Sequence, residues 1–149
     1  MSSTILLKRK AIMIQARSEN ELLVRLADGE ELTTCLAALK VDSGVILNGV
    51  GMLRKLELAY WNGSEYEITR IDGPVELLSL QGNFACKNEE RMVHCHATVA
   101  RRDAAAFGGH VIKATVHNTT EIFIRELSEI KLERRPEESG LAGLYPSVR

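Results

Sequence analysis

The stretch MLRKLELAYWNGSEYEITRI, residues 52–71, shows the pattern that decides the fold. From residue 52 to 61 a mostly apolar set of side chains alternates with a more polar set, as in a strand whose successive side chains point to opposite faces. Asn62-Gly63 is a dipeptide favoured in two-residue type I′ turns, and residues 66–71 supply a returning strand. The stretch therefore predicts an antiparallel β-hairpin.

The sequence on either side of this hairpin predicts further short strands. Two apolar-rich runs, residues 11–16 and 21–26, flank a turn-forming group, and Gly73-Pro74 breaks the chain after the hairpin. Residues 48–51, Asn-Gly-Val-Gly, and Gly82-Asn83 are expected to end strands, with Gly82-Asn83 either forming a turn or contacting a ligand. The other predicted strands are residues 43–47, 75–81, 92–100, 111–117 and 119–127.

One helix is expected after the second strand. Asp28 is placed to cap it, and Glu31 follows three residues later, as in a capping box. Leu32, Leu36 and Leu39 then fall on one helical face. Many strands with one or two helices predict a single α+β domain with a mixed, largely antiparallel sheet.

Composition limits the classes of function. The chain has 149 residues, is 45% hydrophobic and 26% charged, and carries a formal net charge of −1. DNA-binding proteins generally need basic side chains for phosphate contacts, and the basic runs that could form a phosphate-contacting patch here are Lys8-Arg9-Lys10 and Arg101-Arg102. No segment approaches the ~18 apolar residues that span a bilayer. With three scattered cysteines, this predicts a cytoplasmic protein that does not bind membranes.

Three of the four histidines lie in the stretch HCHATVARRDAAAFGGH, residues 94–110. His94 and His96 are two residues apart in a predicted strand, so both rings point to one face and Cys95 points to the other. His110 follows Gly108-Gly109 at the start of the next strand, although alternation puts it in phase with an apolar set. A bend at Gly109 would separate it from that set.

Two interpretations of this cluster remain open on spacing alone. Three neutral imidazoles that leave a fourth position for water are a common zinc site. Equally, His-x-His is a weak signal, and the three rings could be purely structural. The fourth histidine, His117, is expected to be an exposed strand residue.

Glu76, Arg25 and Asn83 are the other candidate site residues. Glu76 shares an apparently apolar face with Leu78 and Leu80, and a buried carboxylate needs a partner. That partner is either a histidine N–H, with Glu76 behind the metal ligand, or Arg25, which lies in an apolar strand. The remaining interpretation is a partly exposed Glu76 at the start of a strand.

Several of these segments together resemble the plant and prokaryote conserved (PPC) domain family. The resemblance covers about residues 10–130 and leaves 131–149 as a C-terminal tail, expected to lie loosely over the surface. The segments that carry it are VRLADGEEL (24–32), SGVILNGVG (43–51), ELLSLQGN (76–83), His94-Cys-His96 and Gly108-Gly109-His110. It implies an α+β homotrimer, with zinc in some members on the residues matching His94, His96 and His110.

The same resemblance implies an association with DNA. Plant members carry an AT-hook built on Arg-Gly-Arg, whereas this chain has no Arg-Gly-Arg. The expected function is therefore a non-enzymatic, homotrimeric binding module, regulatory or DNA-associated, with zinc or another divalent metal on the three histidines. The alternative is a zinc-dependent enzyme acting on a small molecule, with Glu76 as general base and Arg25 or Asn83 orienting the substrate.

Overall fold

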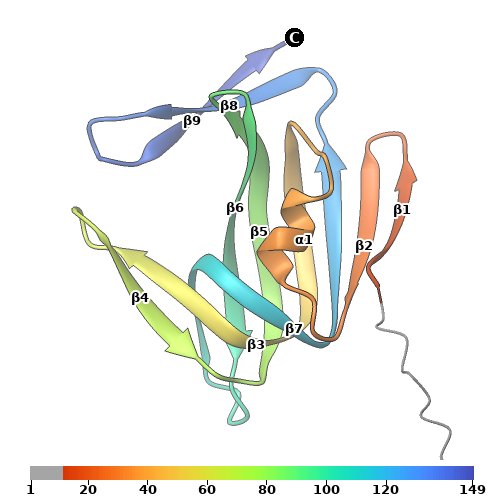
Figure 1. The fold of residues 1–149 in the computed structure, drawn as a ribbon, viewed down its shortest axis with the longest axis vertical. Coiled ribbons are helices and arrows are strands. Elements are labelled where there is room, and N and C mark those ends of the chain that lie inside the picture. The colour runs from red at the N-terminus through yellow and green to blue at the C-terminus, as the bar shows by residue number, and fades with distance from the viewer. Residues whose placement is uncertain (1–11) are drawn as a thin grey trace, which may run out of the picture.

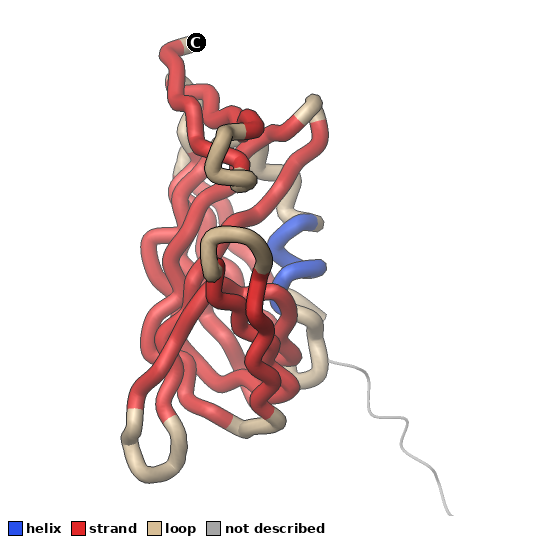
Figure 2. Tube along the Cα trace, turned by 90° about the vertical axis from the view of Figure 1, so that its left-hand side faces the viewer, coloured by secondary structure: helices blue, strands red, loops and turns tan. Residues whose placement is uncertain are grey.

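The computed structural model describes residues 12–149, so the basic run Lys8-Arg9-Lys10 lies outside the described residues. Most of this part of the chain is β-strand, with one short helix on one side of the strands (Figure 2). In chain order the elements are β1 (Ile14–Ser18), β2 (Glu21–Ala27), α1 (Leu32–Ala37), β3 (Gly44–Trp61), β4 (Tyr66–Ile71), β5 (Val75–Lys87), β6 (Glu90–Ala100), β7 (Ala106–Glu126), β8 (Ile130–Pro136) and β9 (Ala142–Val148). The expected α+β class holds in its coarse form, although the fold is nearly all β.

The nine strands form one sheet in the order β1-β2-β7-β3-β5-β8-β9, with β4 on β3 (Figure 1). Strand β6 pairs with both β5 and β7, and β3 also pairs with both. These four long strands therefore close into a ring of antiparallel pairs. The single parallel contact, between β5 and β8, makes the sheet mixed as expected.

One hydrophobic cluster lies inside this arrangement. Helix α1 contacts β6 and β7 and contributes Leu32 and Leu36 to the cluster. Burying large aliphatic side chains in this way is the main favourable contribution to folding. Its largest fully buried members are Leu22, Val24, Leu26, Leu32, Leu36, Ile46, Leu53, Leu56, Leu80, Phe84, Ile122 and Ile124. The helix of the described residues, α1, is not long and apolar enough to cross a membrane.

The hairpin predicted from residues 52–71 is confirmed as β3–β4, but its turn is longer than two residues. The backbone N–H of Asn62 donates to the Glu65 carbonyl at 3.1 Å, closing a four-residue loop. The Asn62 side-chain oxygen accepts from the backbone N–H groups of Ser64 and Glu65 at 3.0 and 2.9 Å. This side chain thus favours an Asx-type turn over the type I′ turn.

The helix is confirmed, but the residue that caps it is Glu31 and not Asp28. The Glu31 carboxylate accepts from the backbone N–H groups of Thr33 and Thr34 at 3.1 and 2.7 Å, which satisfies two of the unpaired donors of the first turn. The helix therefore begins at Leu32, four residues after Asp28.

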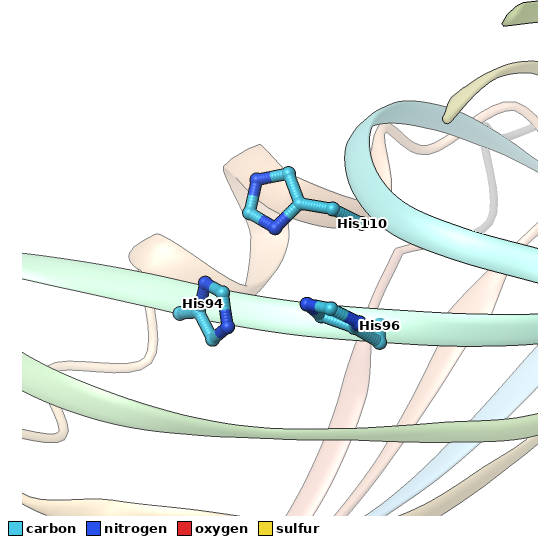
Figure 3. Close-up of side chains that lie close together, drawn as sticks. All are labelled: His94, His96 and His110. Atoms are coloured by element: carbon cyan, nitrogen blue, oxygen red, sulfur yellow. The ribbon is translucent and has the colours of Figure 1, made fainter. Parts of the chain in front are cut away.

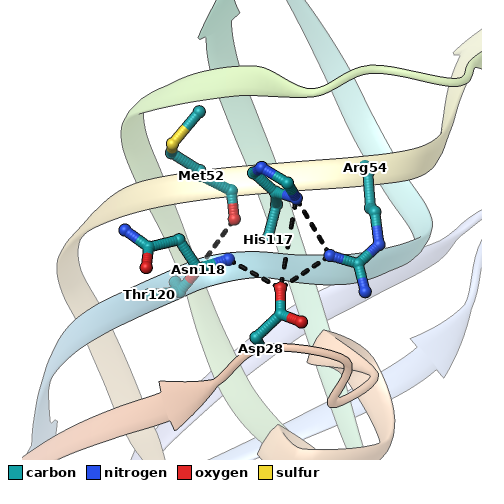
Figure 4. Close-up of polar contacts among 6 residues, drawn as sticks. All are labelled: Asp28, Met52, Arg54, His117, Asn118 and Thr120. Carbon is teal, nitrogen blue, oxygen red and sulfur yellow. Dashed lines mark hydrogen bonds and ion pairs between the residues drawn. The ribbon is translucent and has the colours of Figure 1, made fainter.

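Asp28 instead joins the helix connection to the sheet (Figure 4). Its carboxylate accepts from the Arg54 guanidinium at 2.6 Å and from the backbone N–H of Asn118 at 2.8 Å. His117 Nδ1 lies 2.9 Å from Arg54 and 4.0 Å from Asp28. His117, expected to be exposed, is therefore partly buried in a polar cluster.

Several predicted strand ends are wrong because the strands continue past them. Residues 48–51 lie inside β3, which shifts register against β7 on both sides of them. Gly82-Asn83 lies inside β5, and residues 111–126 belong to a single strand, β7. A Cβ on Gly82 would lie 2.0 Å from the His94 carbonyl oxygen, so this glycine permits close strand approach and does not form a turn.

The tail expected to lie loosely after residue 130 is an ordered hairpin, β8–β9. Leu132 is buried, and its backbone N–H donates to Ser43 Oγ at 3.0 Å. This hairpin extends the sheet beyond β5, beside the turn that joins β5 to β6 (Figure 1).

Candidate metal centre

Three histidines from two neighbouring strands meet at one place (Figure 3). His94 and His96 lie two residues apart on β6, and His96 is directly opposite His110 on β7. Ring centroids are 4.9 to 5.4 Å apart, and one ligand nitrogen from each ring lies within 4.8 Å of the others. Alternation on β6 and cross-strand pairing with β7 thus bring the rings together.

The phase problem at His110 is resolved by an extra residue in β7, not by a bend at Gly109. Glu57 pairs with Lys113 and Leu58 with Val111, so Ile112 is an extra residue in β7. Ile112 and Lys113 are therefore both exposed, and the apolar alternation resumes only at Ala114. His110 does share a face with Ile112, as alternation predicts, but at this point that face lies outside the core.

Cys95 lies on the opposite face of β6, as predicted. It is buried in the hydrophobic cluster, and this burial raises the pKa of its thiol to about 12. The thiol is therefore protonated at neutral pH, and protonated sulfur is a poor metal ligand.

The environment of His94 and His110 favours their neutral imidazoles. Burial is the largest cause that lowers the pKa of His94 to about 4, followed by the charge of Arg134 and then by the other two histidines. Burial, and then His96, also lower the pKa of His110. Neutral imidazoles keep the nitrogen lone pair that a metal ion needs.

The histidines line a cavity of about 790 Å³. Tyr66 stacks on His110 with ring centroids 5.2 Å apart, and Trp61 packs edge-on against Tyr66 at 5.1 Å. The β8–β9 hairpin forms another wall, and it contributes Arg134 as well as Gly140, Leu141 and Ala142. The walls of the cavity are therefore formed by β3, β4, β6, β7 and the C-terminal hairpin.

Of the other predicted site residues, only Asn83 reaches this region. Asn83 lies opposite His94 on β5, and its side-chain oxygen accepts from Arg134 at 2.9 Å. Arg25 is exposed on β2 and donates to Thr119 Oγ1 at 3.2 Å, away from the cavity.

Glu76 is also exposed and does not line the cavity. The expectation that it shares a buried face with Leu78 and Leu80 is wrong, because β5 shifts register between Leu77 and Ser79. This irregularity leaves Leu78 on the outer face with Glu76, whereas Leu80 is buried.

Arg134 is a site residue that the sequence does not predict, because it falls in the expected C-terminal tail. Leu132 and Arg134 are two residues apart and share a strand face. The apolar residue at position 132 is the sequence signal that indicates a strand with Arg134 on its inner side.

The three histidines fit a divalent metal such as zinc. His110 Nδ1 is buried and has no hydrogen-bond partner in residues 12–149, which is a costly state that a ligand would relieve. Zinc–nitrogen bonds of about 2.0–2.1 Å in a tetrahedral site place ligand nitrogens ~3.3 Å apart. Small ring rotations from the observed separations would meet this requirement.

Comparisons with known proteins agree with this fold. The family model of the Plants and Prokaryotes Conserved (PCC) domain matches residues 13–128. A PPC protein from Pyrococcus horikoshii is 33% identical with a TM-score of 0.77, over 88% of this chain and 92% of that one. A comparison with curated proteins gave no significant match.

Two further solved structures are similar. A protein from Bacteroides thetaiotaomicron, described as a "putative DNA binding protein", is 26% identical with a TM-score of 0.84, over 91% of this chain and 98% of that one. A metal-containing protein from Archaeoglobus fulgidus is 25% identical with a TM-score of 0.77, over 91% and 99% of the two chains. The resemblance seen in the sequence is thereby confirmed, and the chain belongs to the plant and prokaryote conserved domain family.

Proposed function

We propose that this protein is a non-enzymatic binding module that holds one divalent metal ion, zinc in the first instance, and works as a homotrimer associated with DNA or with another regulatory partner. The convergence of His94, His96 and His110 around a point within reach of all three rings is the observation that carries the proposal. The similar metal-containing protein from Archaeoglobus fulgidus supports it.

The metal is tested by elemental analysis of protein purified without an affinity tag. We expect about one metal ion per chain in the wild type and an occupancy lower by about tenfold or more in His96→Ala, because two ligands from one strand no longer act together. His117→Ala is the matched control, since His117 contacts Arg54 and lies outside the site. Metal-free wild type, or unchanged occupancy in His96→Ala, would contradict the proposal.

The homotrimer is supported by an exposed apolar patch that consists of Leu23, Leu47, Val50 and Phe123. These side chains are 41 to 50% exposed. Leu23 on β2 is directly opposite Phe123 on β7, and β3 runs along the other side of β7. Contiguous apolar surface on neighbouring strands is typical of a contact between subunits.

Association with DNA is supported by the similar structure described as DNA-binding. The basic run Arg101-Arg102 lies in the exposed loop between β6 and β7. We expect the protein to retard duplex DNA in a gel at low salt, with weaker retardation at higher salt because phosphate contacts release counterions.

Arg102→Gln should reduce the DNA retardation, whereas Arg70→Gln, an exposed arginine of the β3–β4 hairpin, should not. A wild-type protein that causes no retardation at low salt would remove DNA from the proposed function.

The zinc-enzyme alternative loses the general base that it required. Glu76 is exposed outside the cavity, and no carboxylate from residues 12–149 lines the cavity. Hydrolysis at a metal-bound water needs a base within hydrogen-bond reach of the reacting proton. We therefore favour a binding role for the site.

A further inference from the structure

Arg134 is a cation held in the cavity without a counter-charge. Its Nη1 donates to the Ala142 carbonyl at 3.0 Å and its Nη2 to the Asn83 side-chain oxygen at 2.9 Å. Both acceptors are neutral. Its Nε is buried and has no partner in residues 12–149.

Among the described arginines, Arg54 and Arg134 are partly buried and the others are exposed. Arg54 forms an ion pair with Asp28, whereas Arg134 forms no ion pair within the described residues. A partly buried arginine without a carboxylate is therefore particular to this site. Removing a charge from water without a charged partner is unfavourable, so this environment favours an anionic ligand at Arg134.

The two hydrogen bonds fix the direction of the guanidinium. With Asn83 and Ala142 holding its two terminal nitrogens, the group cannot swing out of the cavity without losing both bonds. A planar guanidinium that is held in place binds carboxylates well, because little motion is lost when the anion arrives. The three histidines add no negative charge, and a metal on them would make the cavity more positive still.

The remaining walls are apolar or aromatic and favour an organic ligand over a bare inorganic anion. Trp61, Tyr66, Met92 and Leu141 line the same cavity, and the β8–β9 turn lies against Trp61 at Gly140. A volume of about 790 Å³ falls within the range of small-molecule sites. A flat or apolar body would lie along these walls while its charged end meets Arg134.

We infer that this cavity binds a small organic carboxylate, with the carboxylate on Arg134 and the body of the ligand against Trp61 and Tyr66. The inference deepens the proposed function and shares its cavity, but the contact that defines the ligand class is to Arg134. Residue 134 also lies beyond the part of the chain matched by the family model, which ends at residue 128. The ligand class is therefore set by the C-terminal hairpin.

The single tryptophan of the chain provides the readout, because Trp61 lines the cavity. We would titrate benzoate and its neutral analogue benzamide and follow tryptophan fluorescence in metal-free and zinc-loaded protein. Benzoate should bind about tenfold or more tightly than benzamide. Arg134→Gln should abolish this preference, and Arg134→Lys should retain part of it, since lysine keeps the charge but not the fork.

Arg135→Gln is the matched control, because Arg135 is exposed, pairs with Glu133 and lies over Tyr145. It should leave benzoate binding unchanged. Equal binding of benzoate and benzamide, no benzoate response in the wild type, full benzoate affinity in Arg134→Gln, or complete displacement of benzoate by equimolar inorganic phosphate would each overturn the inference. In His96→Ala the preference for benzoate should persist even if that variant loses its metal, so failure of the metal site and failure of the Arg134 contact are told apart.

Discussion

His94 is the histidine whose acid–base chemistry the fold changes most. Its pKa falls from 6.5 to about 4, first through burial and then through the charge of Arg134. In the unfolded chain the imidazole regains its ordinary pKa, so between these two values the unfolded state binds more protons than the folded state. The stability associated with neutral His94 is therefore complete above pH 6.5 and is lost as the pH falls towards 4.

We expect the metal-free protein to lose stability on acidification through this window more steeply than a His94→Gln variant, because glutamine takes up no proton. Denaturant midpoints measured in the presence of a chelator, at several values between pH 4 and 7, check this expectation. His117→Gln should follow the wild type, since His117 lies in a different cluster. Parallel curves for wild type and His94→Gln would contradict the assigned cause.

Residue patterns predicted the centre of the site but not its edge. His94 and His96 were placed on one face by a two-residue period, and Cys95 on the other, because both statements depend only on the geometry of a single strand. Hydrogen bonds to Asn83 and Ala142 hold Arg134 in the cavity, and Asn83 is far away in the sequence. A contact between distant residues produces no periodic pattern in the sequence around Arg134.

At the scale of elements, the sequence predicted what is decided locally. The β3–β4 hairpin and α1 follow from alternation, turn residues and an N-terminal cap within a few positions. The errors in strand face fall where a strand shifts register, at Ile112 in β7 and near Leu78 in β5. A β-bulge is fixed by the partner strand, so period-two reasoning carries the wrong face past it.

The C-terminal hairpin was missed for a similar reason. Strand β8 buries one large residue, Leu132, and meets β5 through a single parallel pairing of Cys86 with Glu133. Its composition is that of a surface segment, because four of its residues, Lys131, Glu133, Arg134 and Arg135, are charged. The contacts that join it to the sheet, such as that of Leu132 with Ser43 just before β3, are made with residues far away in the sequence.

At the scale of the whole molecule, the exposed apolar patch of Leu23, Leu47, Val50 and Phe123 favours association of several chains over a single chain in solution. Four such side chains on adjacent strands leave apolar area in water that a second copy would cover. The sequence could not identify this patch, because each residue is an ordinary strand residue until the strand pairing brings them together.

Phe123→Glu should therefore convert an assembly of three 16.5 kDa chains into single chains without unfolding them, because a charge in the contact is buried only when subunits associate. Sedimentation equilibrium of the wild type and the variant, with circular dichroism as a check on folding, measures the change. Val148→Glu, at an exposed position of β9, is the control and should leave the mass unchanged. A wild type that sediments as one chain would contradict the homotrimer.

The position of the cavity wall in the chain makes the two parts of the site separable by truncation. The three histidines lie on β6 and β7, whereas Arg134 and the turn against Trp61 belong to the C-terminal hairpin that follows. A chain that ends after β7 should therefore keep the three histidines and lose the Arg134 contact on which the inferred selectivity for an organic acid depends.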